Sequence, residues 1–392
     1  MTERGSAARL TQYEAKPGVI DLAWGHPDPT LLPVQELREA THRAMERHGP
    51  DILEYGSTAG SPPLIDFICA RLAETDARAP NPAEVVITSG ASQGLDLVAT
   101  LLLAAGDTVL LDVPTYHLAM SILADHPVRL EAVASDADGV VIDDLERTIL
   151  QLRRAGERPR LLYTIPTFHN PTGRNVSLER RKALVALAAQ ENLLIAEDDT
   201  YRELSYDGPP PPSLWALDRA GSVVRIGSFA KSVAPGLRLG YLTATPEIVS
   251  RMANGGMLDS GGGTNHFAGT VLAEYAGSGD YARQVERFCT AYRKQRDRLL
   301  DGLAEHMPDG AAWSRPAGGF FVWVQLPPAI DAEELLPVAM AKGMAFLPGN
   351  RFFLDEGAAP GALRLAFSMY PAATLDEATA ALGDAIRSMA AG

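Results

Sequence analysis

The chain has 392 residues, of which 46% are hydrophobic and 21% are charged, a composition typical of a globular protein with one large and one small domain. Its formal net charge is -14, from 35 Lys and Arg against 49 Asp and Glu. This acidic balance disfavours binding to nucleic acid backbones and to anionic lipid, so we expect neither as a partner.

Targeting and metal signals are weak throughout the chain. The first twenty residues contain no apolar block of signal-peptide length, and the apolar run LVATLLLAA is too short to span a bilayer. We therefore expect a cytoplasmic protein. The two cysteines, Cys69 and Cys289, provide no disulfide framework, and the eight histidines lack metal-ligand spacing. We expect no metal site.

From about residue 84, short strand-like runs alternate with longer runs of helical periodicity. This alternation is typical of βαβ units in a largely parallel sheet. The predicted strands are residues 84–90, 108–112, 160–164, 193–199, 223–229 and 239–244. Together they predict an α/β domain over residues 45–285.

The remainder of the chain has a different pattern. A long charged helical stretch leads into strand-like runs at residues 318–327 and 362–368 and then into an amphipathic helix. These elements predict a small α+β domain over residues 286–392, to which the N-terminal arm, residues 1–44, contributes.

Ligands of open α/β sheets bind at the carboxyl ends of the strands, so residues at these positions are the candidates for a binding site. After the first strand, Gly90, Ala91 and Ser92 open a helix, whose free N–H groups can hold a phosphate. A tight turn that binds no ligand would show the same sequence pattern.

Two later strand ends carry an aromatic ring and an amide. Tyr116 follows VLLDVPT, where its ring could cover a planar ligand, although an isolated aromatic residue is more often part of a core. Asn170 precedes Pro171, which favours an extended backbone and can present the amide to a cleft. The alternative is an ordinary loop.

Three acids, Glu197, Asp198 and Asp199, follow the apolar run at residue 193. Because neighbouring side chains of a strand point to opposite faces, one acid can enter a pocket while the next faces away. Tyr201 can reach the same pocket from the following turn. Acidic runs are usually solvated, but the apolar strand before this one weakens that interpretation.

Lys231 ends an apolar run in RIGSFAKSVAPGLRLGY. A buried amine has a lowered pKa and becomes a nucleophile or a Schiff-base former, whereas a strand that ends in a solvated lysine would have no such role. Ser228 and Arg238 flank the lysine and suit a phosphate dianion. A nucleotide-binding P-loop is excluded because Ala230 stands where that motif requires glycine.

A strand-end lysine, an acid, a phosphate-binding turn, a covering aromatic ring and a late arginine together suit pyridoxal 5'-phosphate (PLP). The motifs NPTG, EDDTYREL, SFAKSVAPGLRLG and RPAGGFFVWVQLP occur in this chain. With them, nearly the whole chain resembles the class I/II aminotransferases of fold type I, especially the 2-aminoadipate and aromatic aminotransferase-like branch. The resemblance implies a large α/β domain with a mostly parallel seven-stranded sheet flanked by helices, and a small α+β domain.

The resemblance also implies roles for individual residues. Lys231 would form the Schiff base and later carry a proton, and Asp198 would pair with the protonated pyridine nitrogen. Around the ring, Asn170 and Tyr201 would bond its oxygen, and Tyr116 would stack on it. The residues implied at the phosphate are Gly90, Ala91, Ser92, Ser228 and Arg238, together with Tyr55 from the neighbouring subunit of a homodimer.

At the substrate, the resemblance implies that Arg364 binds the α-carboxylate in a bidentate manner, with Gly25 lining the pocket through its backbone and Asn170 alongside. Three features depart from the family pattern. Ala230 replaces a serine, Gly261–Gly263 stand where some relatives carry bulkier residues and predict an open side-chain pocket, and Arg9 is not aligned as a distal-carboxylate ligand.

The implied reaction is the exchange of an amino group between an L-amino acid and a 2-oxo acid. The alternative is a PLP-dependent biosynthetic enzyme of the same fold that catalyses β- or γ-substitution, cyclisation or carbon–carbon bond formation through a quinonoid. A third interpretation, the effector domain of a transcription regulator, requires a DNA-binding segment before the arm, which we do not expect here.

Overall fold

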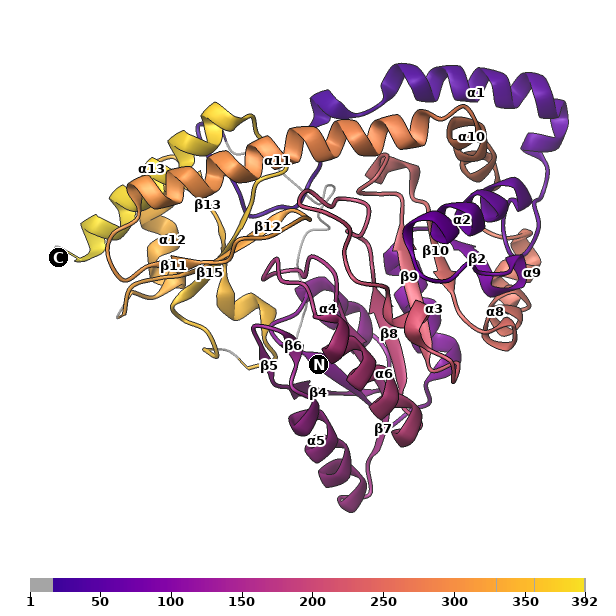
Figure 1. The fold of residues 1–392 in the computed structure, drawn as a ribbon, viewed down its shortest axis with the longest axis horizontal. Helices are drawn as coiled ribbons and strands as arrows, with labels where there is room; N and C mark the ends of the chain where they lie inside the picture. The colour runs from indigo at the N-terminus through magenta and orange to yellow at the C-terminus, as the bar shows by residue number, and fades with distance from the viewer. Residues whose placement is uncertain (1–16, 329, 356, 391–392) are drawn as a thin grey trace, which may run out of the picture.

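A seven-stranded sheet forms the centre of the larger lobe (Figure 1). The structure is a computed structural model that describes residues 17–328, 330–355 and 357–390. In spatial order the strands are β2 (Val85–Thr88), β10 (Gly240–Thr243), β9 (Val223–Ser228), β8 (Leu194–Asp198), β7 (Arg158–Thr164), β3 (Asp107–Asp112) and β4 (Arg129–Val133). Only β10 runs antiparallel to its neighbours in this sheet. The expected mostly parallel sheet is confirmed.

Strand β4 was not predicted from the sequence. Its residues, RLEAV, alternate between exposed and less exposed positions, and only Val133 is buried. It lies at the edge of the sheet, beside β3. An edge strand needs fewer apolar side chains than a central one, so the apolar-run criterion that identified the other six strands did not detect it.

Helices cover both faces of the sheet, because successive strand residues point to opposite sides. Val109 and Leu111 of β3 pack in one core and Leu110 packs in the other. The first core is covered by α3 (Ala91–Leu102), α4 (His117–Ala124), α8 (Pro246–Ala253) and α9 (Gly256–Gly261); the second by α5 (Ile142–Arg154), α6 (Leu178–Glu191) and α7 (Leu214–Leu217). This is a doubly wound arrangement.

A third core lies at the β2 edge of the sheet. Val85 and Ile87 of β2 pack there against α1 (Val34–His48), α2 (Pro62–Thr75) and α10 (His266–Gly277). Helix α1 contacts α10, and Figure 1 shows it running along the outside of this lobe. The end of the N-terminal arm therefore packs on the larger lobe through α1, whereas the sequence predicted that the arm contributes to the small domain.

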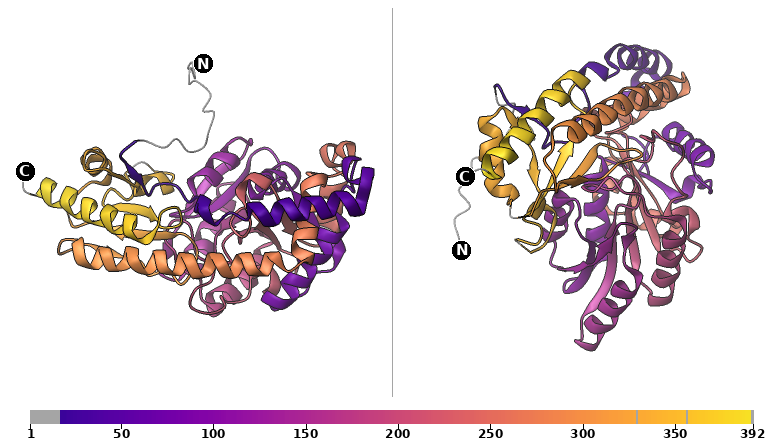
Figure 2. Two further views of the ribbon diagram at one scale, coloured as in Figure 1. Left: turned by 90° about the horizontal axis from the view of Figure 1, so that it is seen from above. Right: turned by 60° about the vertical axis from the view of Figure 1, so that its left-hand side comes forward.

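Helix α11 (Asp280–His306) runs from the larger lobe into the smaller one (Figure 1). The smaller lobe has the sheet order β11 (Ala312–Trp313), β12 (Phe321–Gln325), β15 (Ala362–Ala366), β14 (Leu347–Pro348), with α12 (Ala332–Ala341) and α13 (Ala372–Ala390). Figure 2 shows α13 lying alongside α11. The short strands β1 (Ile20–Asp21) and β13 (Met344–Ala345) form a parallel pair, which joins the N-terminal segment to this lobe.

The predicted domain boundaries fall inside helices. The boundary at residues 44 and 45 lies within α1, and the boundary at residues 285 and 286 lies within α11. The division of the chain at those residues stays a prediction. In the part of the chain that the structure describes, no helix combines the length and the apolar character needed to cross a membrane.

Candidate active site

A cleft lies at the carboxyl ends of the central strands, where the smaller lobe and the N-terminal segment meet the sheet. It contains about 1080 Å³ of empty space, part of which is open to solvent. All predicted site residues except Tyr55 and Gly90 line it, namely Gly25, Ala91, Ser92, Tyr116, Asn170, Asp198, Tyr201, Ser228, Lys231, Arg238 and Arg364. The strand-end rule therefore located the cleft correctly.

Lys231 lies three residues beyond the end of β9, with its amine turned into the cleft. Its Nζ donates a hydrogen bond to the carbonyl oxygen of Gly25 at 2.7 Å. Burial, with further contributions from Arg364 and Arg238, lowers the pKa of Lys231 to about 8. The solvated-lysine alternative is therefore wrong, and a neutral, nucleophilic amine is accessible near physiological pH.

Asp198 is the acid that enters the cleft, from the last position of β8. Its carboxylate accepts hydrogen bonds from the Tyr163 hydroxyl at 2.8 Å and from the Thr200 hydroxyl at 2.5 Å. Burial raises the pKa of Asp198, and among the described residues no cation forms an ion pair with it. A buried acid with only neutral hydrogen-bond donors suits a ligand that supplies a positive charge.

The other two acids of the run point away from the cleft, as strand alternation predicts. Glu197 accepts N–H bonds from Leu214 and Trp215 at 2.8 and 2.9 Å. Asp199 pairs with the Arg225 guanidinium. These two acids therefore have structural partners of their own.

An anion site lies at the start of α3, beside Arg238. Gly90 is the N-cap of this helix, with φ of 85°, and Ala91 and Ser92 form its first turn. A Cβ atom at Gly90 would lie 2.6 Å from Arg238 Nη2, so only glycine allows the guanidinium to approach the helix end. Helix N–H groups beside a guanidinium suit a phosphate dianion.

Arg364 reaches the cleft from β15 of the smaller lobe and is 2% exposed. Its guanidinium donates to Asn170 Oδ1 at 2.7 Å and to the carbonyl oxygen of Ala23. The Phe321 ring lies against it, at 4.2 Å from the guanidinium carbon to the ring centre. Burial lowers the pKa of Arg364 to about 10, so it stays cationic at neutral pH. Its Nε has no hydrogen-bond partner in the described structure.

PLP, the cofactor implied by the sequence resemblance, fits this set of groups. Lys231 supplies an amine for its carbonyl, Asp198 supplies an anion for a protonated ring nitrogen, and the α3 start with Arg238 suits its phosphate. Tyr116 and Tyr201 contribute aromatic rings to the cleft wall. Burial raises the pKa of both phenols, that of Tyr116 to about 12, so both remain hydrogen-bond donors.

The sequence did not identify several residues of the cleft. These are Trp24, His117, Tyr163, Thr200 and Phe321. The period of β7 could have indicated Tyr163, because Leu161 and Tyr163 share one face of that strand. Phe321 belongs to a continuous apolar run, a pattern that predicts a buried core strand and not a residue of a binding site. It also explains Gly25, where a Cβ atom would lie 2.5 Å from the Phe321 ring.

Gly261–Gly263 do not line the cleft of their own chain, and the open side-chain pocket expected from them stays a prediction. Gly262 and Gly263 pack on the loop that begins at Tyr55. A Cβ atom at Gly262 would lie 2.7 Å from the carbonyl oxygen of Gly56, and one at Gly263 would lie 2.2 Å from that of Ser57. Close packing against backbone therefore explains Gly262 and Gly263, whereas a Cβ atom at Gly261 would meet no other atom within 4 Å. Arg9 lies outside the described residues.

Comparisons with known proteins find relatives along nearly the whole chain. The family model for aminotransferase class I and II matches residues 17–382. The chain is 34% identical to aromatic-amino-acid aminotransferase 1 of Thermococcus litoralis, over 94% of this chain and 88% of the relative. It is 33% identical to 2-aminoadipate transaminase of Thermus thermophilus, over 98% and 93%. The crystal structure of Pyrococcus horikoshii kynurenine aminotransferase in complex with PMP superposes with a TM-score of 0.89 and 32% identity, covering 95% of this chain and 91% of that one.

Proposed function

The chain belongs to the class I and II aminotransferase family, and from this premise we propose how its cleft residues share the exchange of an amino group between an L-amino acid and a 2-oxo acid. It is a PLP-dependent enzyme of fold type I. One observation carries the division of roles: Lys231, the unpaired acid Asp198 and the buried Arg364 line a single cleft.

When bound, PLP supplies the carbonyl group and the electron-accepting ring on which amino-group exchange depends. Lys231 would hold the cofactor through Nζ and would carry the proton of the substrate α-carbon. Asp198 would hold a proton on the ring nitrogen. Asn170 and Tyr201 would bind the ring oxygen, and Tyr116 would pack against the ring.

The phosphate is held by the start of α3 and by the groups around Lys231. The residues that we assign to it are Gly90, Ala91, Ser92, Ser228 and Arg238. Helix N–H groups and a guanidinium bind a dianion more strongly than neutral donors do. These groups share one cleft with Lys231 and Tyr116, which supports their assignment to the same cofactor.

Arg364 binds the substrate α-carboxylate, because a buried cation with an unpartnered Nε lies in the cleft beside Asn170. Since Arg364 comes from the smaller lobe and Lys231 from the larger one, substrate binding joins the two lobes and excludes water. Gly25 has no Cβ atom, which leaves room for the Phe321 ring that packs against Arg364.

Replacing Arg364 with lysine should weaken amino-acid binding and leave cofactor affinity unchanged. Lysine keeps the charge but loses the planar fork, which corresponds to about 1–3 kcal/mol, or roughly 5- to 150-fold. The measurement is the amino-acid concentration that half-converts bound PLP to pyridoxamine phosphate when no oxo acid is present. Arg351→Lys, an exposed arginine of the smaller lobe, is the matched control.

The same assay tests the reaction type. Conversion of the wild-type cofactor by donor alone supports transamination. A cofactor that stays as PLP while the amino acid is consumed would favour the substitution or bond-forming alternative. An unchanged half-conversion concentration in Arg364→Lys would place the carboxylate site elsewhere.

We further propose a homodimer with shared active sites, located in the cytoplasm. Tyr55 is 82% exposed and does not line the cleft of its own chain. Leu53, Met257 and Phe267 are also exposed, and the bond between His266 and the carbonyl oxygen of Asp51 joins their segments. Exposed apolar side chains on adjoining segments indicate a contact surface, from which Tyr55 would reach the phosphate of a second copy.

Mixing two inactive variants should restore activity if the sites are shared. A hybrid of a Lys231→Ala subunit and a Tyr55→Ala subunit contains one site with both residues intact. Random exchange at equal concentrations should therefore return about a quarter of the wild-type sites. Activity and the mass of differently tagged dimers are the measurements. Complete subunit exchange without any return of activity would contradict the shared site.

A further inference from the structure

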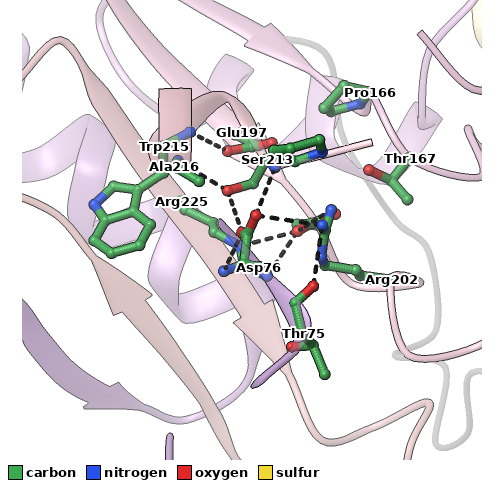
Figure 3. Close-up of polar contacts among 12 residues, drawn as sticks. Thr75, Asp76, Pro166, Thr167, Glu197, Arg202, Ser213, Trp215, Ala216 and Arg225 are labelled. Atoms are coloured by element: carbon green, nitrogen blue, oxygen red, sulfur yellow. Dashed lines mark hydrogen bonds and ion pairs between the residues drawn. The ribbon is translucent and has the colours of Figure 1, made fainter. Parts of the chain in front are cut away.

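Behind the cleft, on the opposite side of β8, lies a group of four charged side chains that we call the buried ion cluster: Asp76, Asp199, Arg202 and Arg225. Arg225 is 1% exposed, Asp199 4% and Arg202 6%, and the Asp76 carboxylate is fully buried. Figure 3 shows Asp76 between Arg202 and Arg225. The cluster joins the end of α2 to β9 and to the turn after β8.

Arg225 is the principal partner of Asp199. Its Nε donates a hydrogen bond to Asp199 Oδ2 at 2.9 Å, and its Nη2 forms an ion pair with the same oxygen at 2.8 Å. Arg202 Nη1 lies 3.7 Å from that oxygen, and Asp199 Oδ1 has no hydrogen-bond partner in the described structure. Arg225 therefore supplies most of the charge compensation for Asp199.

Asp76 has partners that do not depend on Arg225. It accepts bonds from the Ser213 N–H at 3.0 Å and from the Ser213 hydroxyl at 2.5 Å, and Arg202 Nη2 lies 3.3 Å away. The distance from Asp76 to Arg225 Nη1 is 3.4 Å. Arg225 is nevertheless the largest charge contribution that lowers the pKa of Asp76, so loss of Arg225 would affect both carboxylates, while Asp76 would keep its bonds to Ser213.

The acidic and basic side chains on this side of β8 are equal in number, although burial and the charge of Asp199 raise the pKa of one of the acids, Glu197, to about 7. Glu197, two residues before Asp199, lies 4.0 Å from Arg181 of α6. Three acids, Asp76, Glu197 and Asp199, therefore face three arginines, Arg181, Arg202 and Arg225. All are shielded from solvent, so Coulomb interactions among them are weakly screened. Removing Arg225 would leave a surplus negative charge around Asp76 and Asp199, which protonation of Glu197 would offset only in part near neutral pH.

That surplus charge would lie next to Asp198. Asp199 follows Asp198 in the chain, and its N–H donates to the carbonyl oxygen of Ile226, beside Arg225 on β9. The charge of Asp199 already contributes to raising the pKa of Asp198, after the larger effect of burial. On the cleft side, the titratable groups that interact with Asp198 are Lys231, Tyr116, Tyr163 and Tyr201.

We propose that Arg225 is a positioning residue for the aminotransferase reaction: by compensating the charge of Asp199, it keeps Asp198 ionised and able to hold the protonated ring nitrogen of the cofactor. This inference rests on the proposed role of Asp198. It assigns a function to a buried ion pair that stability alone does not require, because apolar replacements of such pairs are often as stable.

The test measures affinity for pyridoxamine phosphate by equilibrium dialysis as a function of pH, because this form of the cofactor makes no Schiff base with Lys231 and its binding does not require the neutral amine. Asp198 must be ionised to bind the cationic ring, so affinity falls as pH drops through its pKa. We call this fall in affinity at low pH the acidic limb of the profile. Arg225→Met should move the acidic limb to higher pH and should weaken affinity at neutral pH about tenfold. Asp199→Asn, which leaves a surplus positive charge, should move the limb to lower pH.

Two further variants restore the balance. Arg225→Lys keeps the charge, and Arg225→Met combined with Asp199→Asn removes both charges, so both should show the wild-type limb. Arg296→Met removes a buried arginine of α11 that pairs with Asp207, and it controls for loss of stability. If Arg225→Met does not fold, the downward shift of Asp199→Asn and the wild-type limb of the double variant still decide the question.

The inference is overturned if single variants shift the limb in the same direction, or not at all, or if the double variant fails to restore it. Asp198→Asn separates this result from the proposed function. Loss of the acidic limb in Asp198→Asn supports the role of Asp198, whatever Arg225 does. A retained limb in that variant would contradict the role of Asp198 itself.

Discussion

Replacement of Lys231 with alanine is expected to abolish amino-group exchange, with a loss of about four orders of magnitude or more, because one side chain supplies both the covalent attachment and the proton carrier. The fold should persist, since the Nζ atom makes only one hydrogen bond in the described structure, to Gly25. The measurement combines turnover with mass spectrometry after borohydride reduction and denaturation, which detects covalently attached cofactor.

Lys182→Ala is the matched control for this variant, because Lys182 is an exposed lysine of α6 that pairs with Glu179. It should retain both the covalent cofactor and full turnover. Cofactor that stays attached in Lys231→Ala after reduction would remove Lys231 from the mechanism. A cooperative thermal transition near that of the wild type would show that the loss of activity does not come from unfolding.

Replacement of Asp198 with alanine should retain covalent attachment of the cofactor and yet lower the rate by about a thousandfold or more. Without the carboxylate, nothing in the described cleft would hold a proton on the ring nitrogen, and a neutral ring accepts the charge of the substrate α-carbon poorly. Tyr163 and Thr200, which bond Asp198 at 2.8 and 2.5 Å, are neutral and cannot replace it.

Asp198→Glu keeps the charge on a longer side chain and should recover part of the rate. The rate of a single turnover with donor amino acid is the measurement, since it isolates the chemical step from product release. A turnover within tenfold of the wild type in Asp198→Ala would contradict the assignment. Asp199 would not then be the substitute, because its carboxylate bonds Arg225 behind the strand.

The sequence predicted those parts of the site that depend on local pattern. Strand alternation predicted that one acid of the run enters the cleft while its neighbours face away, the family resemblance identified that acid as Asp198, and the apolar flanks of Lys231 indicated a buried amine. These inferences succeed because a strand with a buried end fixes the direction of each side chain. The edge strand β4 escaped detection for the complementary reason, since its exposed positions carry charge.

Other parts of the site depend on contacts that no local pattern encodes. Arg364 and Asn170 are 194 residues apart and meet only in the folded chain. The pairing of Asp199 with Arg225 joins two strands in the same way. The absence of side chains at Gly262 and Gly263 suggested open space, whereas in the structure backbone oxygen atoms of the Tyr55 loop occupy the positions that Cβ atoms would need. In each of these cases, contacts between segments that are distant in the sequence determine which residues come together.

Helix α11 has a consequence for the cooperativity of unfolding. Its first turns, with Tyr281 and Val285, belong to the core of the larger lobe, and its later turns, with Leu299 and Leu303, belong to that of the smaller lobe. Melting of either core would remove the packing that keeps this helix folded, and an isolated helix gains little stability from its own backbone bonds. The two lobes therefore form one thermodynamic unit, in which a substitution in one lobe lowers the free energy of unfolding of both.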